Sequence, residues 1–264
     1  MVERLPQRRG RLELRGVDKN FAENVPAVRG ITLCCEAGEF VALVGPSGCG
    51  KSTLLNVIAG MTAADAGTIT LEGKPIDGPG PDRAMVSQDQ GLFPWLTAAE
   101  NIEFGLKMAD VPKSERDDRV AAVLKAVHLP RSGKKLVHEL SGGMRQRIAI
   151  ARALVIDPAL LLMDEPFAAL DAQTRTLLHV HLQELWCTTH KTILFVTHSV
   201  GEAVRLADRV VILHANPGRI RKEVLVDLPH PRNFDSPEVG NLVRIIRAEI
   251  EDEVTRVNTE IASS

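Results

Sequence analysis

A glycine-rich stretch directly after an apolar run constrains this chain more than any other feature. Residues Phe40 to Val44 are continuously apolar, Gly45 to Thr53 read Gly-Pro-Ser-Gly-Cys-Gly-Lys-Ser-Thr, and a helical pattern follows from Leu54 to Ala59. This order of strand, loop and helix is the context that the phosphate-binding pattern G-x-x-x-x-G-K-[ST] requires. The chain is therefore expected to form an open α/β sheet that holds phosphate groups at the start of a helix.

Each residue type in this loop suits the binding of ATP. Glycine lets backbone N–H groups converge on phosphate oxygens, Lys51 adds a positive charge beside the β and γ phosphates, and the hydroxyl of Ser52 is expected to bind Mg²⁺. The alternative for such a stretch is an ordinary glycine turn. Cys49 is expected to be a small filler, with a redox thiol as its alternative. The residues expected to line ATP are Gly45, Pro46, Ser47, Gly48, Cys49, Gly50, Lys51, Ser52 and Thr53.

Composition narrows the class of protein. The chain has 264 residues, of which 44% are apolar and 25% charged, as in a soluble globular protein. Its net charge of −2 provides no basic field, so we expect no nucleic-acid partner. The longest apolar runs are far shorter than the roughly 20 residues that span a bilayer. The four cysteines lack metal-ligand spacing, which suggests a reducing cytosol.

Short apolar runs alternate with helical patterns along the chain. We expect an α/β fold: a P-loop NTPase core with a parallel sheet, a small antiparallel β layer, a helical insert and a C-terminal helical tail. The predicted segments are the first part of the ATP-binding core (1–91), the insert (92–140), the second part of the core (141–214) and the tail (215–264). The apolar stripe of the tail either packs on its own core or docks another subunit. The predicted strands are Leu12 to Val17, Ile31 to Cys35, Glu39 to Val44, Thr68 to Glu72, Ala84 to Ser87, Leu160 to Asp164, Thr192 to Thr197 and Arg209 to Leu213, with a polar strand from Arg219 to Val226.

A second apolar strand delivers two carboxylates. Residues 160–163 are apolar, and Asp164 and Glu165 follow at the C-terminal end, where ligands of open α/β sheets bind. Most apolar strands that end in acids are merely entering solvent. Here the phosphate loop favours a role in ATP hydrolysis, with Asp164 holding Mg²⁺ and Glu165 orienting the attacking water.

A second glycine-rich helix start lies between these two elements. Ser141, Gly142 and Gly143 precede the helical run from Ile148 to Val155, and exposed N–H groups with a hydroxyl suit an anion. Taken alone, such a turn is usually only a helix cap.

Together these motifs resemble the ATP-binding subunit of an ABC transporter. Gly45 to Thr53 resembles the Walker A motif, Leu140 to Gln146 the signature motif and Leu160 to Glu165 the Walker B motif, and the resemblance covers about residues 12–213. It implies catalytic roles for Lys51, Gln88, Glu165 and His198. Gln88 resembles the Q-loop glutamine that touches Mg²⁺ and water, and His198 the switch histidine that contacts the γ-phosphate. Phe21 resembles the aromatic residue that stacks on adenine, although the family often has tyrosine there.

The resemblance also implies partners. Two cassettes pair head to tail, as a homodimer or a heterodimer, so that Ser141, Gly142, Gly143 and the D-loop residue Asp171 of one contact ATP held by the other. Separate transmembrane permease subunits would hold the chain at the cytoplasmic face of the cell membrane, and a solute-binding protein would act with them indirectly. Phe93 and Trp95 are expected either to dock the permease or to lie in the core of the insert.

Finer likeness favours one branch of importers. The resemblance to the nitrate, sulfonate and taurine branch, with nitrate favoured, lies in five stretches: Phe93 to Thr97, Ser141 to Arg147, Pro166 to Asp171, His214 to Gly218 and Leu228 to Arg232. A soluble ABC ATPase of translation or DNA repair is the alternative, but the chain lacks its second cassette or long coiled coil. A small-molecule kinase would leave the Ser141 turn unexplained.

Overall fold

The computed structural model describes residues 8–22, 25–215, 217–233 and 236–262, and the side chains of 251–262 are not considered. Its main sheet has six strands, of which the edge strand β10 is antiparallel to β9 and the others are parallel. In sheet order they are β10 (Arg219–Leu225), β9 (Arg209–His214), β3 (Phe40–Val44), β8 (Thr192–Thr197), β7 (Leu160–Asp164) and β6 (Arg83–Val86). The predicted parallel sheet is confirmed.

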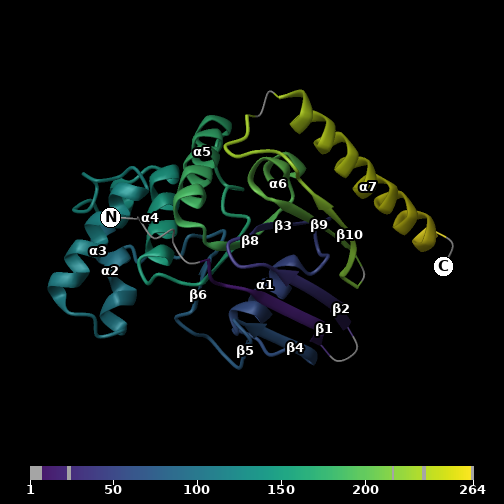
Figure 1. The fold of residues 1–264 in the computed structure, drawn as a ribbon, viewed down its shortest axis with the longest axis horizontal. Helices are drawn as coiled ribbons and strands as arrows, with labels where there is room; N and C mark the ends of the chain where they lie inside the picture. The colour runs from purple at the N-terminus through teal and green to yellow at the C-terminus, as the bar shows by residue number, and fades with distance from the viewer. Residues whose placement is uncertain (1–7, 23–24, 216, 234–235, 263–264) are drawn as a thin grey trace.

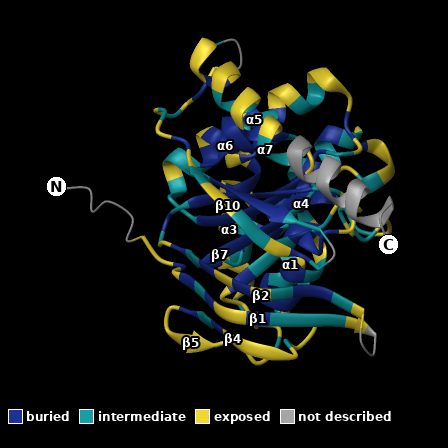
Figure 2. Ribbon diagram, turned by 90° about the vertical axis from the view of Figure 1, so that its right-hand side faces the viewer, coloured by how far each residue is buried: buried dark blue, intermediate teal, exposed yellow. Residues whose placement is uncertain are grey.

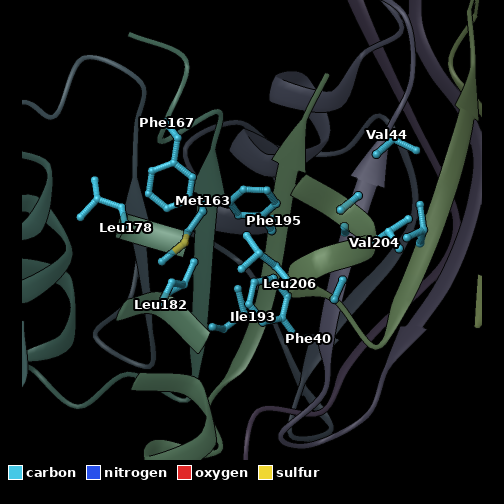
Figure 3. Packing of buried hydrophobic residues seen from close by; sticks show 14 of the residues in the cluster. Phe40, Val44, Met163, Phe167, Leu178, Leu182, Ile193, Phe195, Val204 and Leu206 are labelled. Carbon is cyan, nitrogen blue, oxygen red and sulfur yellow. The ribbon is translucent and has the colours of Figure 1, made fainter. Parts of the chain in front are cut away.

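The central strands are apolar throughout because both of their faces are covered. Alternate residues of β3 enter different clusters: Phe40, Ala42 and Val44 on one face, and Val41 and Leu43 on the other. Alternate residues of β7 and β8 also enter the two different clusters. This is the period of two expected of a strand. Figure 3 shows the first face, where the rings of Phe40, Phe167 and Phe195 pack in the cluster.

The second face of the main sheet packs on α1 and on a four-stranded antiparallel sheet. That sheet has the order β2 (Val25–Cys35), β1 (Leu12–Ala22), β4 (Ala66–Leu71) and β5 (Lys74–Pro75), and the predicted antiparallel layer is confirmed. Strands β1 and β2 are longer than the sequence predicted, because polar residues in the outer part of β1, and Pro26 and Gly30 in β2, hide the strand pattern. Helix α1 (Lys51–Ala59) lies between the two sheets (Figure 1).

A helical lobe lies beside the β6 edge of the main sheet (Figure 1). It contains α2 (Ala98–Met108), α3 (Lys113–Ala126) and the short 3-10 helix η1 (Val137–Glu139), and it shares a separate apolar cluster with α4 (Gly142–Leu154). The expected all-helical stretch is present. Helices α5 (Ala172–Thr189) and α6 (Val200–Leu206) cover the first face of the sheet.

The tail helix α7 (Pro237–Ala262) packs against α6 along its first half. Val239 and Ile246 are buried in the core cluster of the first face, so this half packs on its own core. The C-terminal residues of the predicted stripe lie outside the described side chains.

Figure 2 shows buried residues filling the middle of the molecule and exposed ones along β4 and β5. No helix in the described part of the chain has the length and apolar character needed to cross a membrane.

Candidate functional site

Four strands of the main sheet end side by side and bring the predicted catalytic residues together. Val44, the last residue of β3, is in register with Thr197 of β8, and Val196 is in register with Asp164 of β7. Val86 of β6 lies opposite Met163. Because parallel strands expose their carboxyl ends at one edge, the phosphate loop, His198, Asp164 with Glu165, and Gln88 all leave the sheet at this edge.

The phosphate loop follows β3 and enters α1 without a side-chain cap. Gly50 is the N-cap in the left-handed region at φ 85°, and within the described part of the chain the helix start has no side-chain cap hydrogen bond. An added Cβ at Gly50 would lie 2.5 Å from Cγ1 of Val28 and 2.7 Å from the carbonyl oxygen of Ala27. The loop is therefore pressed against β2 and needs glycine there, while the N–H groups of the helix start remain available to an anion.

Lys51 holds its charge inside this loop. Its side chain is only 6% exposed, and Nζ donates hydrogen bonds of 2.9 Å to the carbonyl oxygens of Gly45 and Pro46. Both acceptors are neutral, so the charge lacks a carboxylate partner at these two contacts. A phosphate group provides the anion that this arrangement favours.

Cys49 is buried behind the loop. Burial is the largest influence and raises the pKa of its thiol, although the charge of Lys51 opposes it. A thiol with a raised pKa and no exposure is a poor nucleophile, so the structure argues against the redox alternative and supports a filler.

Ser52 and Asp164 form a pair of oxygen donors. The hydroxyl of Ser52 donates a 3.0 Å hydrogen bond to Oδ1 of Asp164. Burial is the largest influence on Asp164 and raises the pKa of its carboxyl group; Glu165 raises it further and Ser52 opposes the shift. A hydroxyl and a half-buried carboxylate are hard ligands, so these residues fit a Mg²⁺ ion.

Glu165 lies one residue further, in contact with His198. Its backbone is in the left-handed region at φ 42°, and its N–H donates a 3.0 Å hydrogen bond to the carbonyl of Val196. The side-chain atoms Glu165 Oε2 and His198 Nδ1 are 2.8 Å apart. The sheet and the turn thus aim a carboxylate and an imidazole at the same space beside the phosphate loop.

A buried polar network lies behind His198. Thr197 donates a 2.6 Å hydrogen bond to Glu202 Oε2, and His179 Nε2 is 3.3 Å from Glu202 Oε1. Arg175 also lies near Glu202 and donates a 2.7 Å hydrogen bond to the carbonyl of Leu170. The sequence analysis missed this network because its members are spread over the end of β8 and the two helices α5 and α6.

The turn Ser141–Gly143, here called the signature turn, is packed differently. Ser141 caps α4 by accepting a hydrogen bond from the N–H of Met144, at 3.3 Å. An added Cβ at Gly142 would lie 3.5 Å from Leu170, and one at Gly143 would lie 2.3 Å from Cγ2 of Thr174. Among the described residues, no hydrogen bond or ion pair joins the signature turn to the phosphate loop.

Asp171 shares this patch with the signature turn. It is exposed, caps α5 by accepting a 2.9 Å hydrogen bond from the N–H of Thr174, and follows Leu170 directly. The four residues predicted to contact ATP of a second copy therefore lie together, beside Leu170 and Thr174.

Two predicted residues are exposed near the site. Gln88 follows β6 in a turn, and Phe21 is 67% exposed in β1. Neighbours of Phe21 in β1 pair with β2, whose Ala27 and Val28 contact Gly50. Both residues are available to a ligand, but their expected contacts stay a prediction.

An exposed group of aromatic residues begins the helical lobe. The rings of Phe93 and Phe104 are 4.7 Å apart, and those of Phe93 and Trp95 are 5.6 Å apart. Trp95 is 72% exposed, so its placement in the core of the lobe is wrong. We call Phe93, Trp95 and Phe104 the aromatic patch.

Comparison with known proteins is consistent with this geometry. Residues 28–168 match the model of the ABC transporter family. The nitrate import ATP-binding protein NrtD of Synechocystis is 48% identical over 83% of both chains. The taurine import ATP-binding protein TauB of Shigella boydii is 48% identical over 79% of this chain and 80% of its own.

A solved structure has the same fold. It is the dimeric post-hydrolysis state of an ATP-binding cassette bound to ADP and Pi, which is 31% identical and superimposes with a TM-score of 0.71. The match covers 83% of this chain and all of that one.

Proposed function

The chain belongs to the ABC transporter family and is an ABC ATPase, and we propose that it powers a membrane importer for a small anion. The observation that carries this proposal is the joint exit of the phosphate loop, Asp164–Glu165 and His198 from neighbouring strands. Nitrate or nitrite is the favoured solute, ahead of taurine or another sulfonate. The names of the similar nitrate and taurine import proteins support this class of solute.

The residues at the strand ends divide the work of ATP hydrolysis. Lys51 and the N–H groups at the start of α1 bind the phosphates, and Ser52, Asp164 and Gln88 would hold Mg²⁺. When bound, the ion would offset negative charge on the γ-phosphate. Glu165 orients the attacking water and accepts its proton, and His198 positions this carboxylate through the 2.8 Å contact while facing the γ-phosphate. Phe21 would stack on the adenine ring.

The signature turn would complete the site of a second subunit. Its N–H groups and those at the start of α5 carry the partial positive charge of helix starts, and the capping residues Ser141 and Asp171 are exposed. The dimeric form of the similar cassette supports a pair of cassettes, and we propose that the two pair head to tail. The second subunit is either an identical chain or a related cassette.

The aromatic patch is the proposed contact with a separate permease, which would keep the chain at the cytoplasmic face of the membrane. Exposed tryptophan and phenylalanine are enriched at protein interfaces. Trp95→Ala should weaken co-purification with the permease without loss of folding. Leu225→Ala removes an equally exposed side chain from β10 and serves as the control, since Trp95 and Leu225 are both 72% exposed. Equal recovery with both variants would contradict this contact.

Reconstitution tests the whole proposal. The chain, its native permease and its binding protein are placed in vesicles, and ATP turnover is measured with nitrate, nitrite, taurine or no solute. Stimulation by nitrate that disappears in Glu165→Gln is the expected result. Stimulation by taurine alone would correct the solute. Recovery of the native chain with ribosomes or DNA instead of membranes would favour the soluble ATPase.

A further inference from the structure

Three potential metal ligands meet where the helical lobe contacts α5, in a cluster that ATP hydrolysis does not use. His128 follows the end of α3, and His181 and Glu184 lie one turn apart on α5. One ligand atom from each residue can be chosen so that all three lie within 4.8 Å of one another. We call these three residues the histidine cluster.

The contacts within the cluster are already short. His128 Nε2 is 3.3 Å from Glu184 Oε2, and the rings of His128 and His181 stack with their centres 4.2 Å apart. Two ligands of a tetrahedral Zn²⁺ ion at about 2.1 Å lie about 3.4 Å apart, close to the separation of these two atoms. The stacked rings are only 20° from parallel, so one imidazole must rotate about its side-chain bonds for both to bind one ion.

The backbone at His128 is unusual for its residue type. His128 has φ 55°, in the left-handed region that glycine prefers. Its N–H donates to the carbonyl of Lys125, and the N–H of Leu129 donates to that of Leu124, which is the hydrogen-bond pattern that ends helices at a left-handed residue. A histidine here costs some conformational energy relative to glycine, and the side chain that it adds faces His181 and Glu184.

His181 has a nitrogen without a competing partner. Its Nδ1 is buried, and no hydrogen-bond partner for it lies among the described residues. Arg147, which donates a hydrogen bond to the carbonyl of His128, is the cation that opposes a bound metal here; Glu184 supplies the compensating charge.

We propose that His128, His181 and Glu184 form a binding site for a transition-metal ion of the Zn²⁺ class. Two imidazoles and one carboxylate are the ligand types that Zn²⁺ takes, and they differ from the oxygen ligands preferred by Mg²⁺. Water would take the fourth position, since His128 and Glu184 are exposed. A bound ion would join the end of α3 to α5 and so fix the helical lobe against the main sheet.

Titration of the untagged full chain with Zn²⁺ tests the site. Excess Mg²⁺ occupies oxygen sites during the calorimetric titration, and Co²⁺ serves as a second probe because its visible spectrum reports coordination. We expect one equivalent to bind and the melting temperature to rise with Zn²⁺. His128→Gly and His181→Ala should each weaken binding by about tenfold or more and remove the thermal shift.

Two features of the design keep the result decisive. His128→Gly places the preferred residue at a left-handed position, so loss of binding cannot be attributed to loss of folding. His138→Ala, which removes an exposed histidine elsewhere in the lobe, is the matched control and should bind like the unmodified chain. Equal Zn²⁺ affinity in His128→Gly and the unmodified chain, or a thiolate band in the Co²⁺ spectrum, would overturn the site. ATP turnover does not enter this test, so it stands or fails independently of the proposed function.

Discussion

The chain carries two glycine-rich helix starts, at α1 and α4, and they are built in opposite ways. The start of α1 lacks a side-chain cap, is pressed against β2 and holds the buried Lys51 beside it. The start of α4 is capped by Ser141, lies beside the capped start of α5 and has no basic residue before Arg145. The first is equipped to bind phosphate alone. The second offers only helix-end N–H groups and a hydroxyl, so in the proposed pair it would meet an anion that another subunit presents.

Removing the charge at α1 should have the largest effect. Lys51→Ala should weaken ATP binding by about 100-fold, because charge-assisted hydrogen bonds to phosphate contribute about 3 kcal/mol. Fluorescent nucleotide titration measures the affinity, and Lys74→Ala, which removes a lysine from β5, is the control. Unchanged ATP affinity in Lys51→Ala would contradict the claim that the charge of Lys51 distinguishes the start of α1 from the start of α4.

A pair of glycine substitutions sharpens the account of α4. Gly143→Ala should lower the free energy of unfolding by about 1–3 kcal/mol, because the new methyl group would overlap Thr174. Gly142→Ala meets only an ordinary contact with Leu170 and should be neutral or slightly stabilising. Urea denaturation compares the two. Equal stability of both variants would mean that the signature turn is not packed against the start of α5 as described.

The polar network behind His198 joins the end of β8 to α5 and α6, and the charge of its Glu202 can be titrated. Burial is the largest influence on Glu202 and acts to raise its pKa, but hydrogen bonds from His179 and Thr197 and the charge of Arg175 leave it below the ordinary value of 4.5. The charged form therefore stabilises the fold at neutral pH, and this contribution is lost as the pH falls through the lowered pKa.

Glu202→Gln should accordingly lower the free energy of unfolding by about 2 kcal/mol at pH 7. The difference from the unmodified chain should narrow below pH 4.5, since Glu202 is then increasingly protonated and becomes neutral like glutamine. Chemical denaturation at several pH values measures this difference. If the difference in free energy of unfolding between the two chains stays constant down to the acid transition, the charge of Glu202 is not its cause.

The smallest effect concerns the thiol inside the phosphate loop. Brief maleimide labelling followed by mass spectrometry should modify Cys34 and Cys187, which are partly exposed, and spare the buried Cys35 and Cys49. ATP should change the pattern little, because Cys49 is shielded before nucleotide binds. Rapid labelling of Cys49 would show that the loop at α1 is open, contrary to its tight packing on β2.

Sequence alone predicted the parts of the site that are local. The loop from Gly45 to Thr53 and the acids after Leu160–Met163 each lie in one stretch of chain, and parallel strands bring their ends to one edge. The Glu202 network was not predictable. The contacts that Arg175, His179 and Thr197 make with Glu202 depend on how α5 and α6 lie over the sheet. The packing of Gly143 on Thr174 is hidden for the same reason.

The dimeric state of a hydrolysis-deficient chain tests the central claim most directly. Asp and Asn are as good N-caps as Ser, so Ser141→Asp and Ser141→Asn keep α4 capped and differ chiefly in one negative charge. We predict that Glu165→Gln with Mg-ATP forms a dimer in light-scattering chromatography, that adding Ser141→Asn preserves it, and that adding Ser141→Asp leaves a monomer that still binds ATP. Equal dimer formation by both double variants would contradict a site shared between two subunits.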